Sequence, residues 1–100
     1  MKREQAITIL RANRDALAAA GVLHAYLFGS VARDEAGSES DIDIMIDVAR
    51  EPFTLFDKLR VKDRLENLFC RDVDVIIRAD VLEPGKKLSR VASEEAINVF

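Results

Sequence analysis

Three aspartates are placed where their carboxylates could hold metal ions. Asp41 and Asp43 open an apolar stretch that alternates like a strand, and Asp74 has the same position before a later apolar run. Residues two apart on a strand project from one face, so the first two carboxylates repel each other and are costly to desolvate. A bound cation relieves both problems, and oxygen ligands without a nearby His or Cys favour Mg²⁺ or Mn²⁺. If the two strands are neighbours, the three carboxylates can bridge two divalent ions.

A candidate phosphate site precedes these carboxylates. Gly29 and Ser30 end an apolar run, and ten residues separate them from Asp41. Glycine lets the backbone approach a ligand closely, and a serine at a helix N-terminus offers its hydroxyl and free N–H groups to a phosphate. Arg33, one turn later, would add a positive charge over the same anion. A phosphate site beside a metal site is what a nucleoside triphosphate requires.

Each half of this pattern is weak when taken alone. An Asp-x-Asp on a strand is usually a solvated face, and Gly-Ser after a strand is usually a turn. The two together, at this spacing and in a strand–turn–strand context, predict a site.

The elements that must position these residues follow from the periodicity of apolar residues. We expect helices over residues 2–20, 30–36, 54–69 and 86–96, a short helical turn capped by Asp80, strands over 23–28, 41–48 and 73–77, and an edge strand or partner contact over 97–100. This order predicts an α/β or α+β fold in which helices cover a sheet.

Two of these elements carry sharper predictions. The helix over 54–69 is expected to begin at Thr54, with Asp57 as its capping-box partner. Its buried face is expected to comprise Leu55, Leu59, Leu65, Leu68 and Phe69.

The two strands that carry aspartates should each present one apolar and one polar face. In 41–48, one face is expected to carry Ile42, Ile44, Ile46 and Val48, and the other Asp41, Asp43, Met45 and Asp47. Asp47, further along the strand, reads as a solvated or structural carboxylate. In 73–77, Asp74 shares its expected face with Asp72, which is therefore a rival for the third position of the site.

Length and charge limit the class of protein. The chain has 100 residues, a formal net charge of -3 and a pI near 5.1, so we expect one domain over 1–100 and no direct nucleic-acid binding. Because a chain of this length buries only a small core, binding to a partner or self-association could add to its stability. The lone Cys70 and the absence of a signal peptide or membrane span suggest a reducing, cytoplasmic location.

The stretches LFGSVARDEAGSESDIDIMID and DVDVII resemble the minimal nucleotidyltransferases (MNT) of the DNA polymerase β superfamily. The resemblance covers nearly the whole chain and implies a small mixed β-sheet with flanking helices. It matches Gly29 and Ser30 to the phosphate-contacting pair, and Arg33 to an arginine common after it. It also matches Asp41 and Asp43 to metal ligands and Asp74, in preference to Asp72, to the third carboxylate. Val31 and Asp34 depart from the family's usual Arg and Gly.

The resemblance also implies a reaction and a partner. MNT proteins of this size often accompany a helical HEPN-type toxin, so this chain would be the antitoxin. It would move AMP from ATP, with Mg²⁺, to a tyrosine of that toxin. Two alternatives stay open: an antitoxin that neutralises its toxin by binding alone, and a stand-alone transferase that acts on a small molecule.

Overall fold

The computed structural model describes residues 2–32, 42–49, 52–81 and 96–100, apart from the side chains of Ser30, Asp80 and Val81. Its elements are α1 (Arg3–Ala12), α2 (Arg14–Ala19), β1 (Val22–Phe28), α3 (Gly29–Ala32), β2 (Ile42–Val48), α4 (Leu55–Phe69), β3 (Val73–Ile77), α5 (Arg78–Val81) and β4 (Ile97–Asn98). The expected α+β fold with a small mixed sheet and flanking helices is confirmed.

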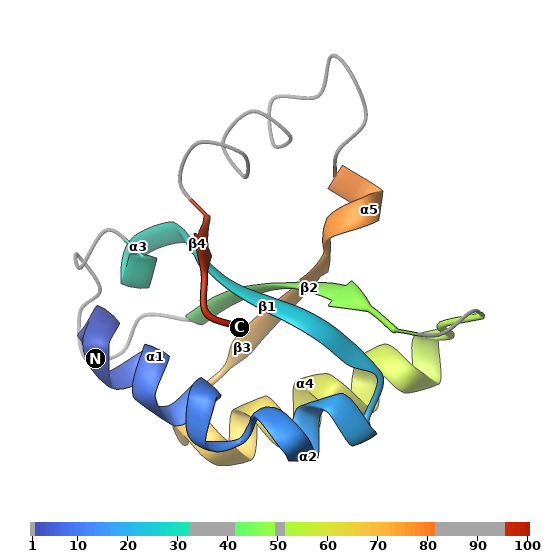
Figure 1. The fold of residues 1–100 in the computed structure, drawn as a ribbon, viewed down its shortest axis with the longest axis horizontal. Coiled ribbons are helices and arrows are strands. Elements are labelled where there is room, and N and C mark those ends of the chain that lie inside the picture. Colours follow the sequence, from blue (N-terminus) through green and yellow to red (C-terminus); the bar gives the residue numbers. More distant parts are fainter. Residues whose placement is uncertain (1, 33–41, 50–51, 82–95) are drawn as a thin grey trace.

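The sheet has the strand order β3-β2-β1-β4. β2 and β3 run parallel and are joined through α4, whereas β1 is antiparallel to both β2 and β4. Helices α1, α2 and α4 all lie against one face of the sheet, below it in Figure 1, while α3 and α5 continue from the ends of β1 and β3. The opposite face is free of these three helices (Figure 1).

The main core lies between the sheet and α1, α2 and α4. On β2, Ile42, Ile44 and Ile46 are almost fully buried in it, as the alternation predicts. The other face of the sheet also buries apolar side chains, including Met45, which the alternation placed on the polar side. There Phe28 and Met45 form a second small cluster with Tyr26, Ile76 and Ala96 packed against it.

Two helices differ from expectation. The predicted helix over 2–20 is divided at Asn13, whose φ of -111° and ψ of 14° leave the helical region. The Asn13 amide donates to the carbonyl of Ile9 at 2.8 Å, a local side-chain bond that competes with helix continuation. The helix α3 begins at Gly29, so Ser30 lies within its first turn instead of preceding it.

The helix α4 begins as predicted but presents a different face to the core. Thr54 and Asp57 form the expected capping box. The buried residues of α4 are Val61, Leu65 and Phe69, and Leu68 is partly buried. The prediction was wrong for Leu55 and Leu59, which are 69% and 49% exposed. Leu59 lies two residues before Val61, about 160° around the helix from it by the shorter way, so its side chain points away from Val61.

The C-terminal part of the chain is described in pieces. The short helix α5 is present but begins at Arg78, so Asp80 lies within it and does not cap it. Of the helix expected over 86–96, all but Ala96 lies outside the described residues, and Ala96 is not helical. The tail forms the predicted edge strand, with Leu27 and Tyr26 of β1 opposite Ile97 and Asn98 of β4. No helix in the described ranges has the length and apolar character to cross a membrane.

Candidate functional site

The structure places Asp43 and Asp74 directly opposite each other. They are Cα partners in the parallel register of β2 and β3, so their backbones are about 4.8 Å apart and their side chains leave the same face of the sheet. This is the face that α1, α2 and α4 do not cover. Asp43 is half-buried and Asp74 is exposed. Two carboxylates held side by side on an accessible face are suited to a divalent cation.

Gly29 packs against the Asp43 carboxylate. The last residue of β1, Phe28, is the register partner of Asp43, so the chain turns into α3 beside this carboxylate. Gly29 has a φ of +75°, which only glycine adopts without strain. A Cβ at this position would overlap the Asp43 Oδ2 and lie 3.2 Å from its Cγ. Glycine is therefore required here both by the turn and by the close approach to Asp43.

The short helix α3 is fixed to the rest of the molecule at its far end. Val31 and Ala32 are buried in the main core. The Arg3 guanidinium of α1 donates to the carbonyl of Ala32 at 3.3 Å. These contacts hold the backbone that follows Gly29 in one place relative to β2.

Some residues named from the sequence lie outside the part of the chain that the structure describes. Asp41, Arg33 and Asp34 lie outside the described residues, and the Ser30 side chain is not described. Within the described ranges, no group of three His, Cys, Asp or Glu side chains could hold a metal ion. The structure thus brings together Asp43, Asp74 and Gly29. Asp72 immediately precedes β3, and its carbonyl accepts from the Ile42 N–H of β2 at 3.2 Å.

Further along the same face, Asp47 has a structural role, one of the two predicted for it. It accepts a hydrogen bond from the Tyr26 hydroxyl at 2.8 Å and lies 3.7 Å from the Arg78 guanidinium. Arg78 also stands over the Tyr26 ring, 5.5 Å from its centroid. These three residues join β1, β2 and the start of α5, at the far end of β2 from Asp43.

The surroundings of Tyr26 predict how the stability of the chain depends on pH. Burial, followed by the hydrogen bond to Asp47 and the charge of Asp47, raises the pKa of Tyr26 above its ordinary value of 10.0. Since the folded pKa is the higher one, this contribution to stability is complete below pH 10 and is lost as the pH rises through the folded pKa. Tyr26 is the only tyrosine and there is no tryptophan, so tyrosinate absorbance reports it directly.

We expect the absorbance midpoint of the folded chain to lie above that of the chain in denaturant. The Asp47→Asn variant should titrate at a lower pH than the wild-type chain, because it loses the negative charge beside the phenol. Coincident midpoints for the folded and denatured chains would contradict the assignment.

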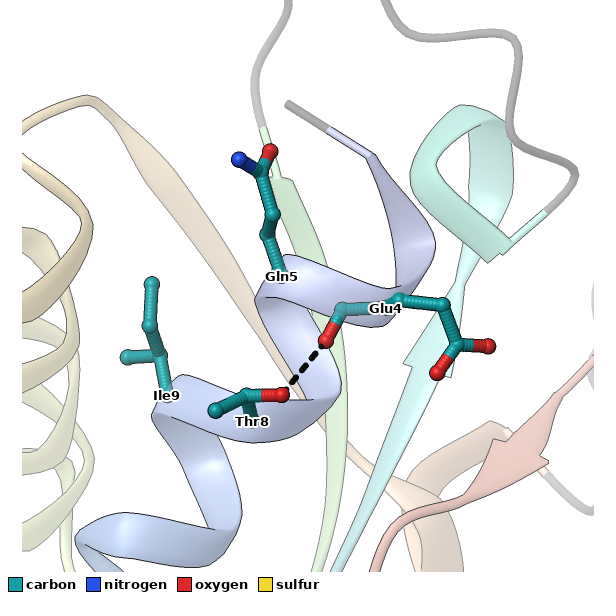
Figure 2. A pocket seen from close by; sticks show the side chains of 4 residues that line it. All are labelled: Glu4, Gln5, Thr8 and Ile9. Carbon is teal, nitrogen blue, oxygen red and sulfur yellow. Dashed lines mark hydrogen bonds between the residues drawn. The ribbon is translucent and has the colours of Figure 1, made fainter.

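A separate hollow lies on α1, lined by Glu4, Gln5, Thr8 and Ile9 (Figure 2). Its polar side chains bond to backbone groups of α1 and its N-cap. The Thr8 hydroxyl donates to the Glu4 carbonyl at 2.9 Å, and the Gln5 side chain accepts from the Lys2 N–H at 3.0 Å. Among these four residues only Glu4 carries a charge. The hollow therefore lacks the paired carboxylates found on β2 and β3, and we place the candidate site at the strands.

A family model described as "Polymerase beta, Nucleotidyltransferase" matches residues 4–97. Two proteins of Methanocaldococcus jannaschii, each named "Putative protein adenylyltransferase", are 43% identical over 56% of this chain and 38% identical over 63% of it. The chain spans 59% and 63% of the length of these two relatives.

Solved structures agree with this match. One named "Structure of putative minimal nucleotidyltransferase" is 37% identical, covers 97% of this chain and 95% of its own, and superposes with a TM-score of 0.72. Another, named as a toxin-antitoxin with AMP-PNP, is 20% identical, covers 100% of this chain and 73% of its own, and has a TM-score of 0.67. At that identity the likeness concerns the fold alone.

Proposed function

Because the chain belongs to the polymerase beta nucleotidyltransferase family, we propose that it transfers AMP from ATP to a hydroxyl group of a protein partner. In its most specific form, the acceptor is a tyrosine of a HEPN-type toxin, and the chain acts as the antitoxin. The names of the archaeal relatives support a protein acceptor. The name of the toxin-antitoxin structure with the same fold makes a toxin the first acceptor to test.

The observation that carries the proposal is the pairing of Asp43 with Asp74 across β2 and β3, with Gly29 packed against Asp43. Metal ions bound by carboxylates stabilise the charge that develops during displacement at phosphorus. The described carboxylates suit hard cations, because their donors are oxygens on an accessible face. Asp41, adjacent to β2 in the sequence, is proposed as the third ligand.

In this proposal, Asp41, Asp43 and Asp74 hold the divalent ions, two Mg²⁺ or Mn²⁺. When bound, the ions offset the negative charge of the triphosphate and of the leaving pyrophosphate. The backbone at Gly29, the Ser30 hydroxyl and Arg33 bind the phosphates.

The chemical step balances without any other reactant. The acceptor oxygen forms a bond to the α-phosphorus of ATP, and the bond from that phosphorus to the bridging oxygen breaks. Pyrophosphate leaves with the electron pair, and Asp74 accepts the proton of the hydroxyl. The protein mainly positions the reactants and offsets their charge.

The test is to incubate the chain with labelled ATP, Mg²⁺ and the product of the neighbouring gene, and then to measure the mass of that product. We expect an added AMP on a tyrosine. An unchanged mass with each of the four nucleotides would contradict the proposal. The double variant Asp41→Ala, Asp43→Ala separates catalysis from occlusion, because a toxin still neutralised by this variant is silenced by binding.

A further inference from the structure

The outer edge of β3 is bonded to side chains of α4. β3 is the edge strand beside β2, so one side of its backbone has no neighbouring strand among the described residues. At Val73, the backbone groups on this side are bonded to side chains of α4. The Val73 N–H donates to the Glu66 carboxylate at 3.2 Å, and the Lys62 ammonium donates to the Val73 carbonyl at 2.9 Å. Lys62 and Glu66 are themselves joined at 3.0 Å. We call these two side chains on Val73 the α4 clasp.

The direction of the backbone groups explains why the clasp falls on Val73. The Ile42 N–H donates to the Asp72 carbonyl at 3.2 Å, so the carbonyl of Asp72 points toward β2. Backbone groups alternate sides along a strand, so the N–H and C=O of the next residue point to the outer edge. An ion pair with one donor and one acceptor satisfies both groups, as a further strand would.

The clasp acts on the residue next to Asp74. Val73 is fully buried beneath the sheet, and Asp74 follows it on the opposite face, in register with Asp43. Fixing both backbone groups of Val73 fixes the pleat from which the Asp74 side chain leaves the strand. The site on the accessible face is thereby connected to a helix on the covered face.

We propose that Lys62 and Glu66 are positioning residues that hold Asp74 opposite Asp43 for metal binding. This inference deepens the proposed function and rests on it for the identity of the reaction. Neither residue belongs to the motif by which the sequence resembles its family. Both act through the Val73 backbone, and neither touches the substrate.

The charge state of the clasp supports this role. The hydrogen bond from Lys62 to Glu66 raises the pKa of the lysine, and the nearby charges of Asp74 and Asp72 contribute in the same direction. The same bond, followed by the bond from the Val73 N–H, lowers the pKa of Glu66. Both groups therefore stay charged around neutral pH, and the lysine lies within the field of Asp74.

The test compares Mn²⁺ binding, measured by electron paramagnetic resonance with a non-hydrolysable ATP analogue present, in the wild-type chain and three variants. Lys62→Met keeps the aliphatic stem and loses the ammonium, while Lys62→Arg restores a cation. Lys58→Met, one helical turn earlier on α4, is the matched control. We expect Lys62→Met to weaken Mn²⁺ binding about 10-fold, as loss of a group that orients a metal ligand does, and Lys58→Met to leave it unchanged. Lys62→Arg should recover most of the loss.

A second variant tests the same inference in case Lys62→Met does not fold. Glu66→Gln keeps an oxygen that can accept from the Val73 N–H, and it should weaken Mn²⁺ binding in the same direction. Thermal unfolding of every variant is measured alongside. If Lys62→Met and Glu66→Gln lower the melting temperature while Mn²⁺ binding matches Lys58→Met, the clasp only protects the strand edge and the inference is wrong. A wild-type chain that binds no Mn²⁺ would also overturn it.

Mn²⁺ binding tests this inference, whereas AMP transfer tests the proposed function, so the two can fail separately. In an active wild-type chain, Lys62→Met should raise the metal concentration for half-maximal rate and change the KM for ATP much less. If the wild-type chain transfers no AMP but Lys62→Met still weakens Mn²⁺ binding, the positioning role stands and the proposed reaction is wrong.

Discussion

Asp43→Asn is expected to lower the rate of AMP transfer about 1000-fold, which corresponds to about 4 kcal/mol of lost transition-state stabilisation. Asparagine has nearly the same shape but no charge, so a metal ion held between positions 43 and 74 loses half of its described anionic partners. The measurement is the rate of labelled AMP incorporation into the partner at saturating ATP and Mg²⁺.

The fold should tolerate this change. The side chain leaves the accessible face of β2, and the substitution removes a like charge beside Asp74. We therefore expect the free energy of unfolding without metal to stay within about 1 kcal/mol of the wild-type value. Urea unfolding in the presence of a chelator measures it.

Asp47→Asn is the matched control, because it lies on the same strand and face, about 13 Å from Asp43. Its amide oxygen can still accept from Tyr26, and its pairing partners are far from the carboxylate pair. This variant should retain most of the activity. A folded Asp43→Asn chain that keeps more than about a tenth of the wild-type rate would mean that the Asp43–Asp74 pair is not the catalytic centre.

Much of this arrangement could be predicted from the sequence because it depends on local rules. The isoleucines at every second position of 42–46 placed Asp43 on the face opposite the core. Thr54 and Asp57 marked the start of α4 through their own hydrogen bonds. The bounds of β3 were predicted as observed, since short apolar runs between turn residues identify strands.

Other features depend on contacts between distant segments and have little local signal. Met45 lies on the polar side of the alternation, yet it is buried because Phe28 comes from a neighbouring strand. Leu59 has a helical spacing from Leu55, but the face of α4 that packs on the core carries Val61 with Leu65 and Phe69. Sequence alone fixes neither strand neighbours nor helix rotation.

The sequence predicted that Asp43 and Asp74 could lie together, but it did not predict the contacts that hold the second strand. The adjacency of Asp43 and Asp74 was conditional on β2 and β3 being neighbours, which the structure shows. The α4 clasp was missed. Its only trace in the sequence is a Lys and a Glu four residues apart, a spacing that is common on exposed helices and seldom has a further role.

Gly29→Ala is the second substitution with a large expected effect, and it should affect stability and activity together. Alanine at a φ of +75° costs about 1–2 kcal/mol, and its Cβ overlaps the Asp43 carboxylate. The overlap is relieved only if Asp43 moves or the turn opens. A displacement of about 1 Å in a catalytic group lowers the rate about 100-fold. We therefore expect the molecules that remain folded to transfer AMP at least about 100-fold more slowly than the wild-type chain.

Gly21→Ala distinguishes the two effects of Gly29→Ala. Gly21 also has a positive φ, +103°, but it lies in the turn between α2 and β1, where its carbonyl accepts from Ala49 at 2.8 Å. An alanine there should destabilise the chain to a similar extent, because the backbone strain is of the same kind. It should leave the rate per folded molecule, and Mn²⁺ binding, close to wild type. If the two variants lose activity only in proportion to their loss of folded protein, then the close approach of Gly29 to Asp43 has no part in catalysis. If only Gly29→Ala loses Mn²⁺ binding while it remains folded, the turn after β1 helps to set the position of the metal ligand on β2.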